Sequence, residues 1–237
     1  MGSMIIGEMP RFTYGIIIVS SILIGCFAAA CLMKYSGARK ETIFYTVVIN
    51  IVMILAFSLM LSVLLTGSIL KMGFVAVGGA AGLLFGITFS AILHKDHSRE
   101  CFSAWIISAP LMYGLSKIAC HLTGCCKGIE YKGLINVRYK KLTGGPFFPA
   151  QITETVVFIL IFLIGLILYL RMKDKLKAAV VVMVISAAAK FGLDYLRYTH
   201  VGVIISDNQI MIICLSVITI IVVHFLNKSN IFERSNS

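Results

Sequence analysis

Ionisable side chains inside apolar stretches are the residues of this chain that could do chemistry. An ionisable group within a membrane-spanning segment is energetically costly, so each one marks a candidate functional site. Cations outnumber anions here, and phosphate favours such a group, because arginine offers a bidentate fork and lysine a point charge. A partly buried carboxylate among them could exchange protons near neutral pH. The residues are Lys117, His121, Glu154, Lys190, Asp194 and Arg197.

The composition places these residues in an integral membrane protein. The chain has 237 residues, of which 59% are hydrophobic and only 13% are charged. A soluble domain carries about 25% charged residues, so a water-soluble surface is excluded. The net charge of +11 comes without aromatic-interleaved basic stretches or zinc-finger spacing, so we expect no nucleic-acid partner.

Seven apolar runs are long enough to cross a bilayer, which takes about 20 helical residues. We therefore predict an all-α, polytopic membrane protein with about seven transmembrane helices. Residues 1–237 should form a single transmembrane domain, in which the longest connection, at about 123–149, is polar and basic. The runs are 13–33, 43–65, 72–93, 102–122, 150–170, 178–197 and 203–226.

The distribution of lysine and arginine predicts the orientation. Eleven of these residues fall on one side of the predicted helices, and the short segments opposite carry few. The positive-inside rule then places the amino terminus outside and the carboxyl terminus in the cytoplasm. The external connection 123–149 breaks the rule with five basic residues. Two interpretations remain open: the connection contacts an anionic lipid or substrate, or it is a solvated loop.

Five of the predicted helices bring polar groups to the outer half of the membrane. Lys190, Asp194 and Arg197 follow at i, i+4 and i+7 and should form one stripe. Alternatively, Lys190 and Asp194 neutralise each other and Arg197 reaches the surface. That alternative leaves the other helices unexplained, so we predict a polar cavity open to the outer leaflet that binds a phospholipid headgroup. Its further members are Tyr14, Lys117, His121, Gln151, Glu154, Asp207, Asn208 and Gln209.

Three cysteines, Cys120, Cys125 and Cys126, leave three interpretations open. They could bind a metal, although zinc sites usually draw ligands from two arms and no second arm is evident. They could provide a thiolate nucleophile activated by nearby lysines. They could also form a helix-end turn or a loop disulfide that involves Cys120. We predict no metal and no cofactor.

The chain resembles the bacterial prolipoprotein diacylglyceryl transferase family. The segment 148–154 is similar to its His-Pro-Ser-Gln-Leu-Tyr-Glu motif, and 190–197 to its Arg-x-x-x-Glu-x-x-Arg motif. The chain departs from the family where Lys117 and Lys190 replace arginines, Cys120 replaces an asparagine and Val77 replaces a histidine. The other similar segments, in order along the chain, are 12–15, 74–82, 116–124 and 208–209.

The resemblance implies a transferase of the bacterial cytoplasmic membrane. It would move a diacylglyceryl group from phosphatidylglycerol to the lipobox cysteine thiol of an exported protein and release glycerol phosphate. It implies Glu154, His121, Lys117 and Arg197 as catalytic residues, with His121 in place of the missing histidine. The implied substrate-binding residues are Tyr14, Gly78, Gly79, Gln151, Lys190, Asp194, Asn208 and Gln209.

Two alternatives come from other functional classes. A catalytically degenerate paralogue would bind lipid or peptide for regulation or export, which the lost arginines and histidine favour. A transporter or thiol-redox membrane protein is the other hypothesis. Transporters usually show broken helices in paired repeats, and this sequence shows no such symmetry.

Overall fold

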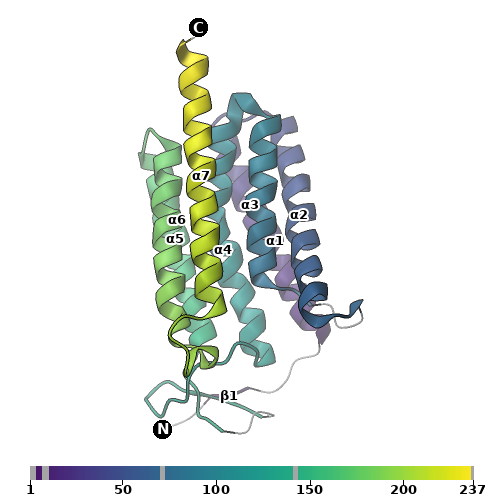
Figure 1. Ribbon diagram of the computed structural model, residues 1–237, viewed down its shortest axis with the longest axis vertical. Coiled ribbons are helices and arrows are strands. Elements are labelled where there is room, and N and C mark those ends of the chain that lie inside the picture. The colour runs from purple at the N-terminus through teal and green to yellow at the C-terminus, as the bar shows by residue number, and fades with distance from the viewer. Residues whose placement is uncertain (1–3, 7–10, 70–72, 141–143, 236–237) are drawn as a thin grey trace.

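The protein is a bundle of seven long helices that lie side by side (Figure 1). The computed structural model describes residues 4–6, 11–69, 73–140 and 144–235, with side chains over 12–69, 73–140 and 144–226. Each helix overlaps one of the predicted apolar runs, with ends that differ by up to nine residues. The bounds are α1 (Arg11–Tyr35), α2 (Lys40–Thr66), α3 (Ala76–Leu93), α4 (Ser98–Thr123), α5 (Ala150–Arg171), α6 (Lys175–Asp194) and α7 (Asp207–Ser235).

Six of these helices are long and apolar enough to span a membrane, which confirms a polytopic, all-α membrane protein. The seventh, α4, has 26 residues but is less apolar. It packs against α1, α3, α5 and α6 and therefore lies inside the bundle. A helix covered by protein needs no apolar exterior, and polar groups of membrane helices face the bundle interior. Accordingly, Lys117, Cys120 and His121 of α4 are buried.

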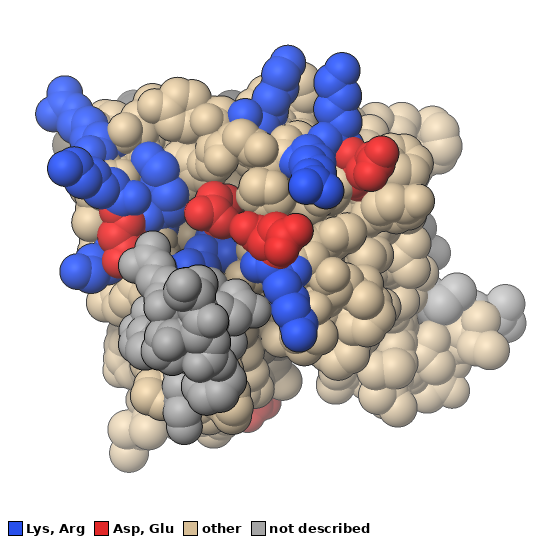
Figure 2. All heavy atoms as spheres, turned by 90° about the horizontal axis from the view of Figure 1, so that it is seen from above, with Lys and Arg blue, Asp and Glu red and all other residues tan. Residues whose placement is uncertain are grey.

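The two ends of the bundle differ in chemistry. At the end that we call the basic face, the turns 36–39, 94–97 and 172–174 join successive helices. Figure 2 looks onto this face and shows Lys and Arg side chains projecting around a few acidic ones. At the opposite end, which we call the site end, α4 and α6 finish and α5 and α7 begin.

The connection after α4 has ordered backbone pairing, although several of its basic side chains are exposed. Its strand β2 (Val137–Tyr139) pairs in parallel with β1 (Met4–Ile6) near the start of the chain. Phe147 exchanges two backbone hydrogen bonds of 2.9 Å with Val137, and both side chains pack with Tyr139 in a small separate core. We call residues 124–140 and 144–149 the cap. Lys141, one of the five basic residues of this connection, lies outside the described residues.

Helix α3 packs closely on α2 through glycines four residues apart. A Cβ atom on Gly78 would lie 2.7 Å from the carbonyl oxygen of Phe57, and one on Gly82 would collide with the carbonyl oxygen of Met53. Small residues let membrane helices approach in this way. The predicted substrate-binding residue Gly78 therefore lies in a helix–helix contact.

Candidate active site

Glu154 lies at the centre of a group of charges at the site end. Helix α5 begins at Ala150, so the carboxylate projects one turn below the helix start. It is fully buried and accepts hydrogen bonds of 2.8 Å from both Nε and an NH2 group of Arg197. The ammonium of Lys190 lies 3.1 Å away and that of Lys117 lies 3.5 Å away. We call Lys117, Glu154, Lys190 and Arg197 the ion cluster.

Arg197 reaches this cluster because α6 ends early. The helix stops at Asp194, and Arg197 adopts an extended backbone conformation with φ −96° and ψ 144°. The cap holds this turn, since the backbone of Ile129 donates to Leu196 and that of Tyr198 donates to the carbonyl of Lys127. The predicted helical stripe through Arg197 is therefore wrong. The chain leaves the helix and directs the guanidinium back to Glu154.

The ion cluster holds three positive charges and one negative charge, and the buried carboxylate of Asp194, 4.0 Å from Nε of Arg197, offsets part of the excess. The side chains of Lys117, Lys190 and Arg197 are 4%, 15% and 8% exposed, and Glu154 is the one carboxylate that all three surround. These cations stabilise the ionised carboxylate, which argues against the expected proton exchange at Glu154. Uncompensated charge is costly away from water. A bound anion would offset it, and a phosphate matches the arginine fork and the lysine charges.

Tyr113 is a member of this site that the sequence did not reveal. Its hydroxyl donates to Glu154 at 2.8 Å, and its ring lies 4.7 Å from the ammonium of Lys117 and 5.4 Å from that of Lys190. Tyr113 precedes Lys117 by one helical turn, so the two share a face of α4. That spacing was a usable signal, but a tyrosine in an apolar run is easily read as core.

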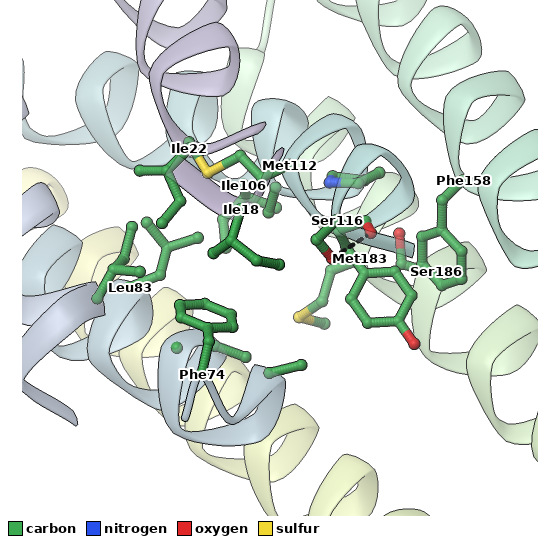
Figure 3. A pocket seen from close by; sticks show the side chains of 17 residues that line it. Ile18, Ile22, Phe74, Leu83, Ile106, Met112, Ser116, Phe158, Met183 and Ser186 are labelled. Carbon is green, nitrogen blue, oxygen red and sulfur yellow. Dashed lines mark hydrogen bonds between the residues drawn. The ribbon is translucent and has the colours of Figure 1, made fainter. Parts of the chain in front are cut away.

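An apolar cavity of about 220 Å³ lies beside the ion cluster, and Tyr113 forms part of its wall. Figure 3 shows Ile18 and Ile22 facing this space across from Phe158, with Ser116 and Ser186 among its few polar side chains. The hydrophilic residues predicted to line a polar cavity pair tightly with one another instead. Opposite charges in contact leave little open space between them, and the cavity beside them is lined mainly by apolar groups.

Asp194, Asn208 and Gln209 fix the start of α7. The carboxylate of Asp194 accepts hydrogen bonds from the Ser206 hydroxyl and, at 3.3 Å, from the Asn208 amide. The backbone of Gln209 donates to the Ser206 hydroxyl, and the Gln209 side chain accepts from the Ser206 backbone at 3.1 Å. This arrangement is a capping box, and its Ser-x-x-Gln spacing in the sequence is a signal for the start of a helix. Asp207, expected in the polar cavity, is exposed at the helix end.

Gln151 connects the cap to α5. Its amide donates to the carbonyl of Cys125 at 2.7 Å and accepts from the Tyr139 hydroxyl at 3.2 Å. Burial raises the pKa of Tyr139, so this hydroxyl remains a donor. Because Gln151 precedes Glu154 by three residues, the cap is anchored directly beside the ion cluster.

The remaining predicted site residues lie around this core. Tyr14 of α1 is half-buried and within electrostatic range of Lys117. His121 is buried one turn beyond Lys117, and no hydrogen-bond partner reaches its Nδ1 among the described residues. Gly79, unlike its neighbour Gly78, lines the apolar cavity.

The three cysteines of the cap and the end of α4 converge. The sulfur atoms of Cys120, Cys125 and Cys126 all lie within 4.8 Å of one another, and none is in a disulfide. Cys120 is buried and Cys126 is exposed, so the group extends from the bundle interior to the surface.

Comparisons with known proteins agree with the resemblance seen in the sequence. The phosphatidylglycerol–prolipoprotein diacylglyceryl transferase 2 of Clostridium perfringens (strain 13 / Type A) is 28% identical over 132 residues. That alignment covers 53% of this chain and 50% of the relative, so the match spans about half the relative's length. The model of the prolipoprotein diacylglyceryl transferase family matches residues 3–226, nearly the whole chain. The chain is thus a multi-pass bacterial membrane protein that belongs to the prolipoprotein diacylglyceryl transferase family.

Proposed function

We propose that this protein transfers the diacylglyceryl group of phosphatidylglycerol to the lipobox cysteine thiol of an exported protein. The observation that carries the proposal is the buried excess of positive charge around Glu154, where three cations face this carboxylate and Asp194. A phosphodiester supplies the anion that this cluster lacks. The adjoining apolar cavity offers a place for an acyl chain of the same lipid. Family membership and the relative's printed activity support the same reaction class.

In this reaction the acceptor sulfur attacks the glyceryl carbon that bears the phosphate. A carbon–sulfur bond forms as the carbon–oxygen bond breaks, and the departing phosphate oxygen keeps the electron pair, which releases glycerol phosphate. The thiol proton must leave before or during attack. Cations fixed beside the departing oxygen stabilise its growing charge without having to reorganise.

The residues take different roles in this proposal. Arg197, Lys117 and Lys190 bind the phosphate and stabilise the departing oxygen. Glu154 positions these cations, because it contacts all three and is held as a carboxylate. His121 accepts the thiol proton, since its Nδ1 has no partner among the described residues. Gly79 lines the cavity proposed for the acyl chain, and Tyr14, within electrostatic range of Lys117, contributes to the headgroup site.

We propose that the basic face lies in the cytoplasm and the site end outside, with the amino terminus external. The positive-inside rule supports this orientation, because the turns at the basic face and the helix ends beside them carry most of the exposed lysines and arginines among the described residues (Figure 2). The site would then open toward the outer leaflet, where an exported acceptor arrives. The bundle and its cap would act as one transmembrane domain.

A reconstituted assay tests the proposal. The purified protein in vesicles containing phosphatidylglycerol should release glycerol phosphate when a lipobox peptide is added, and the peptide should gain the mass of a diacylglyceryl group. Glu154→Gln and Arg197→Ala should each lower the rate by about a hundredfold or more. Lys173→Gln, an exposed lysine at the basic face, is the matched control and should leave the rate unchanged. Wild-type protein that is folded but inactive contradicts the proposal.

A degenerate, lipid-binding paralogue is the second candidate. The observation that favours it is the presence of lysine at positions 117 and 190, where the ammonium groups contact Glu154 at 3.5 and 3.1 Å but offer no bidentate fork to a phosphate. Saturable binding of phosphatidylglycerol without glycerol phosphate release would support this candidate over the transferase.

A further inference from the structure

We propose that Cys120, Cys125 and Cys126 form a binding site for a thiophilic divalent cation, specifically Zn²⁺. Their sulfur atoms lie within 4.8 Å of one another. Three thiolates around a tetrahedral zinc, with zinc–sulfur bonds of about 2.3 Å, lie roughly 3.8 Å apart. The sulfurs therefore need to move by about an ångström or less to enclose the ion. The sequence argued against a metal because no second arm was evident, but one folded segment provides all three ligands.

The backbone is shaped to bring these side chains together. Helix α4 ends at Gly124 with φ 72°, which turns the chain back over the last helical turn and places Cys125 beside Cys120. Neighbouring side chains in an extended segment point in opposite directions. Cys126 instead adopts φ 56°, a left-handed conformation that non-glycine residues rarely take and that concentrates at ligand sites. This turn lets two adjacent cysteines share one site.

The present contacts of the sulfurs are weak, so the thiols are free to take a ligand. The Cys125 thiol donates to the carbonyl of Cys120 at 3.6 Å, and the Thr123 hydroxyl reaches the Cys125 sulfur at 3.5 Å. The cap supplies the support that metal ligands usually have, because Gln151 holds the Cys125 carbonyl at 2.7 Å. The exposed Cys126 gives an ion access from the surface.

The charge of a zinc–thiolate group also fits its neighbours. Three thiolates and one Zn²⁺ carry a net charge of −1, and the ion cluster nearby carries an excess of positive charge even with Asp194 included. Lys117 precedes Cys120 by three residues on α4, and Arg197 lies within electrostatic range of Cys126. The two groups are therefore complementary, and the cations favour the thiolates that bind metal.

Three protein ligands leave the fourth position of zinc open, as in catalytic zinc sites. Resting on the proposed function, we assign that position to the acceptor thiol. On binding zinc the acceptor sulfur would give its proton to His121, the acceptor named in the proposed function, and would become a thiolate beside the phosphate-binding cations. It then attacks the glyceryl carbon, the carbon–oxygen bond breaks, and the thioether product leaves zinc with its fourth position free. The metal changes no oxidation state.

Direct metal binding tests the site without relying on activity. Purified protein is reduced with a phosphine, stripped with a chelator, titrated with Zn²⁺ and analysed for bound zinc; Cd²⁺ gives a thiolate charge-transfer absorption as a second readout. We expect one zinc per chain. Cys125→Ser and Cys126→Ser should each weaken binding by about tenfold or more, whereas Cys214→Ser, an exposed cysteine on α7, should bind like the wild type. Failure to bind, or binding unaffected by Cys126→Ser, overturns the proposal.

The transfer assay then separates the two proposals. A zinc-loaded protein that binds metal through the cysteines but releases no glycerol phosphate overturns the transferase and leaves the metal site standing. Equal transfer by metal-free and zinc-loaded protein overturns the role of zinc in activating the acceptor thiol and leaves the transferase standing. Transfer that falls on zinc removal and returns on its addition supports both.

Discussion

The two ends of the bundle use the same residue types in opposite ways. At the basic face Arg171 is exposed and Asp174 pairs loosely with Arg99, at 3.8 Å and partly in solvent. At the site end Arg197 is buried and grips Glu154 through two hydrogen bonds. In the proposed orientation the first set would face the cytoplasm, and the second, buried in a low-dielectric setting, would act on the substrate of the proposed reaction. The two groups of charged residues therefore differ in burial beside the central helix α4 and not in residue type.

The largest expected difference between the ends concerns the two arginines. Arg197→Lys keeps the charge but loses the fork that holds both oxygens of Glu154, so we expect glycerol phosphate release to fall by about tenfold to a hundredfold. Arg171→Lys changes an exposed side chain and should leave release unchanged. Equal effects of the two substitutions on glycerol phosphate release would contradict the proposed difference in function between the two ends.

The aspartates at the ends of α6 provide the next test. Asp194→Asn weakens the anchor for Ser206 and Asn208 and its attraction to Arg197, so the free energy of unfolding should fall by about 1–3 kcal/mol. Asp174→Asn changes the N-cap of α6, a position where asparagine serves about as well as aspartate. Thermal unfolding in detergent should therefore separate the two variants. Similar melting temperatures would show that Asp194 is not a structural anchor.

Two buried tyrosines allow a finer comparison. The Tyr113 hydroxyl donates to Glu154, whereas the Tyr169 hydroxyl lies 2.6 Å from the Ser36 hydroxyl near the basic face. Tyr113→Phe should lower glycerol phosphate release by about threefold to tenfold, because it removes one hydrogen bond to a charged group. Tyr169→Phe should affect stability alone. A loss of release in both variants would mean that the effect is structural.

The smallest expected effect is on exposed charge at the cap. Lys132 and Lys140 are exposed, so Lys132→Gln and Lys140→Gln should change release by less than about twofold at physiological salt. The same assay at low ionic strength should show a somewhat larger effect if these lysines attract anionic lipid.

The helices were predictable from the sequence, but the turns between them were not. Apolar runs fixed the positions of all seven helices, because a bilayer demands about 20 apolar residues in each. The early end of α6, which redirects Arg197, depends on backbone hydrogen bonds to the cap that no local pattern encodes. Tyr113 was missed because its apolar ring suits a core as well as a site. Gly78 lies against α2, whereas its neighbour Gly79 lines the apolar cavity, and the sequence alone does not reveal which of the two faces α2.

The pairing of β1 with β2 has a consequence for biogenesis and for handling the protein. Four helices separate these strands along the chain, so the cap can pair with β1 only after α1 to α4 have been synthesised. Before β2 has been synthesised, β1 lacks its pairing partner. An affinity tag fused ahead of Met4 would lie beside the cap. A tag placed after α7 would extend from the opposite end of the bundle, at the basic face (Figure 1).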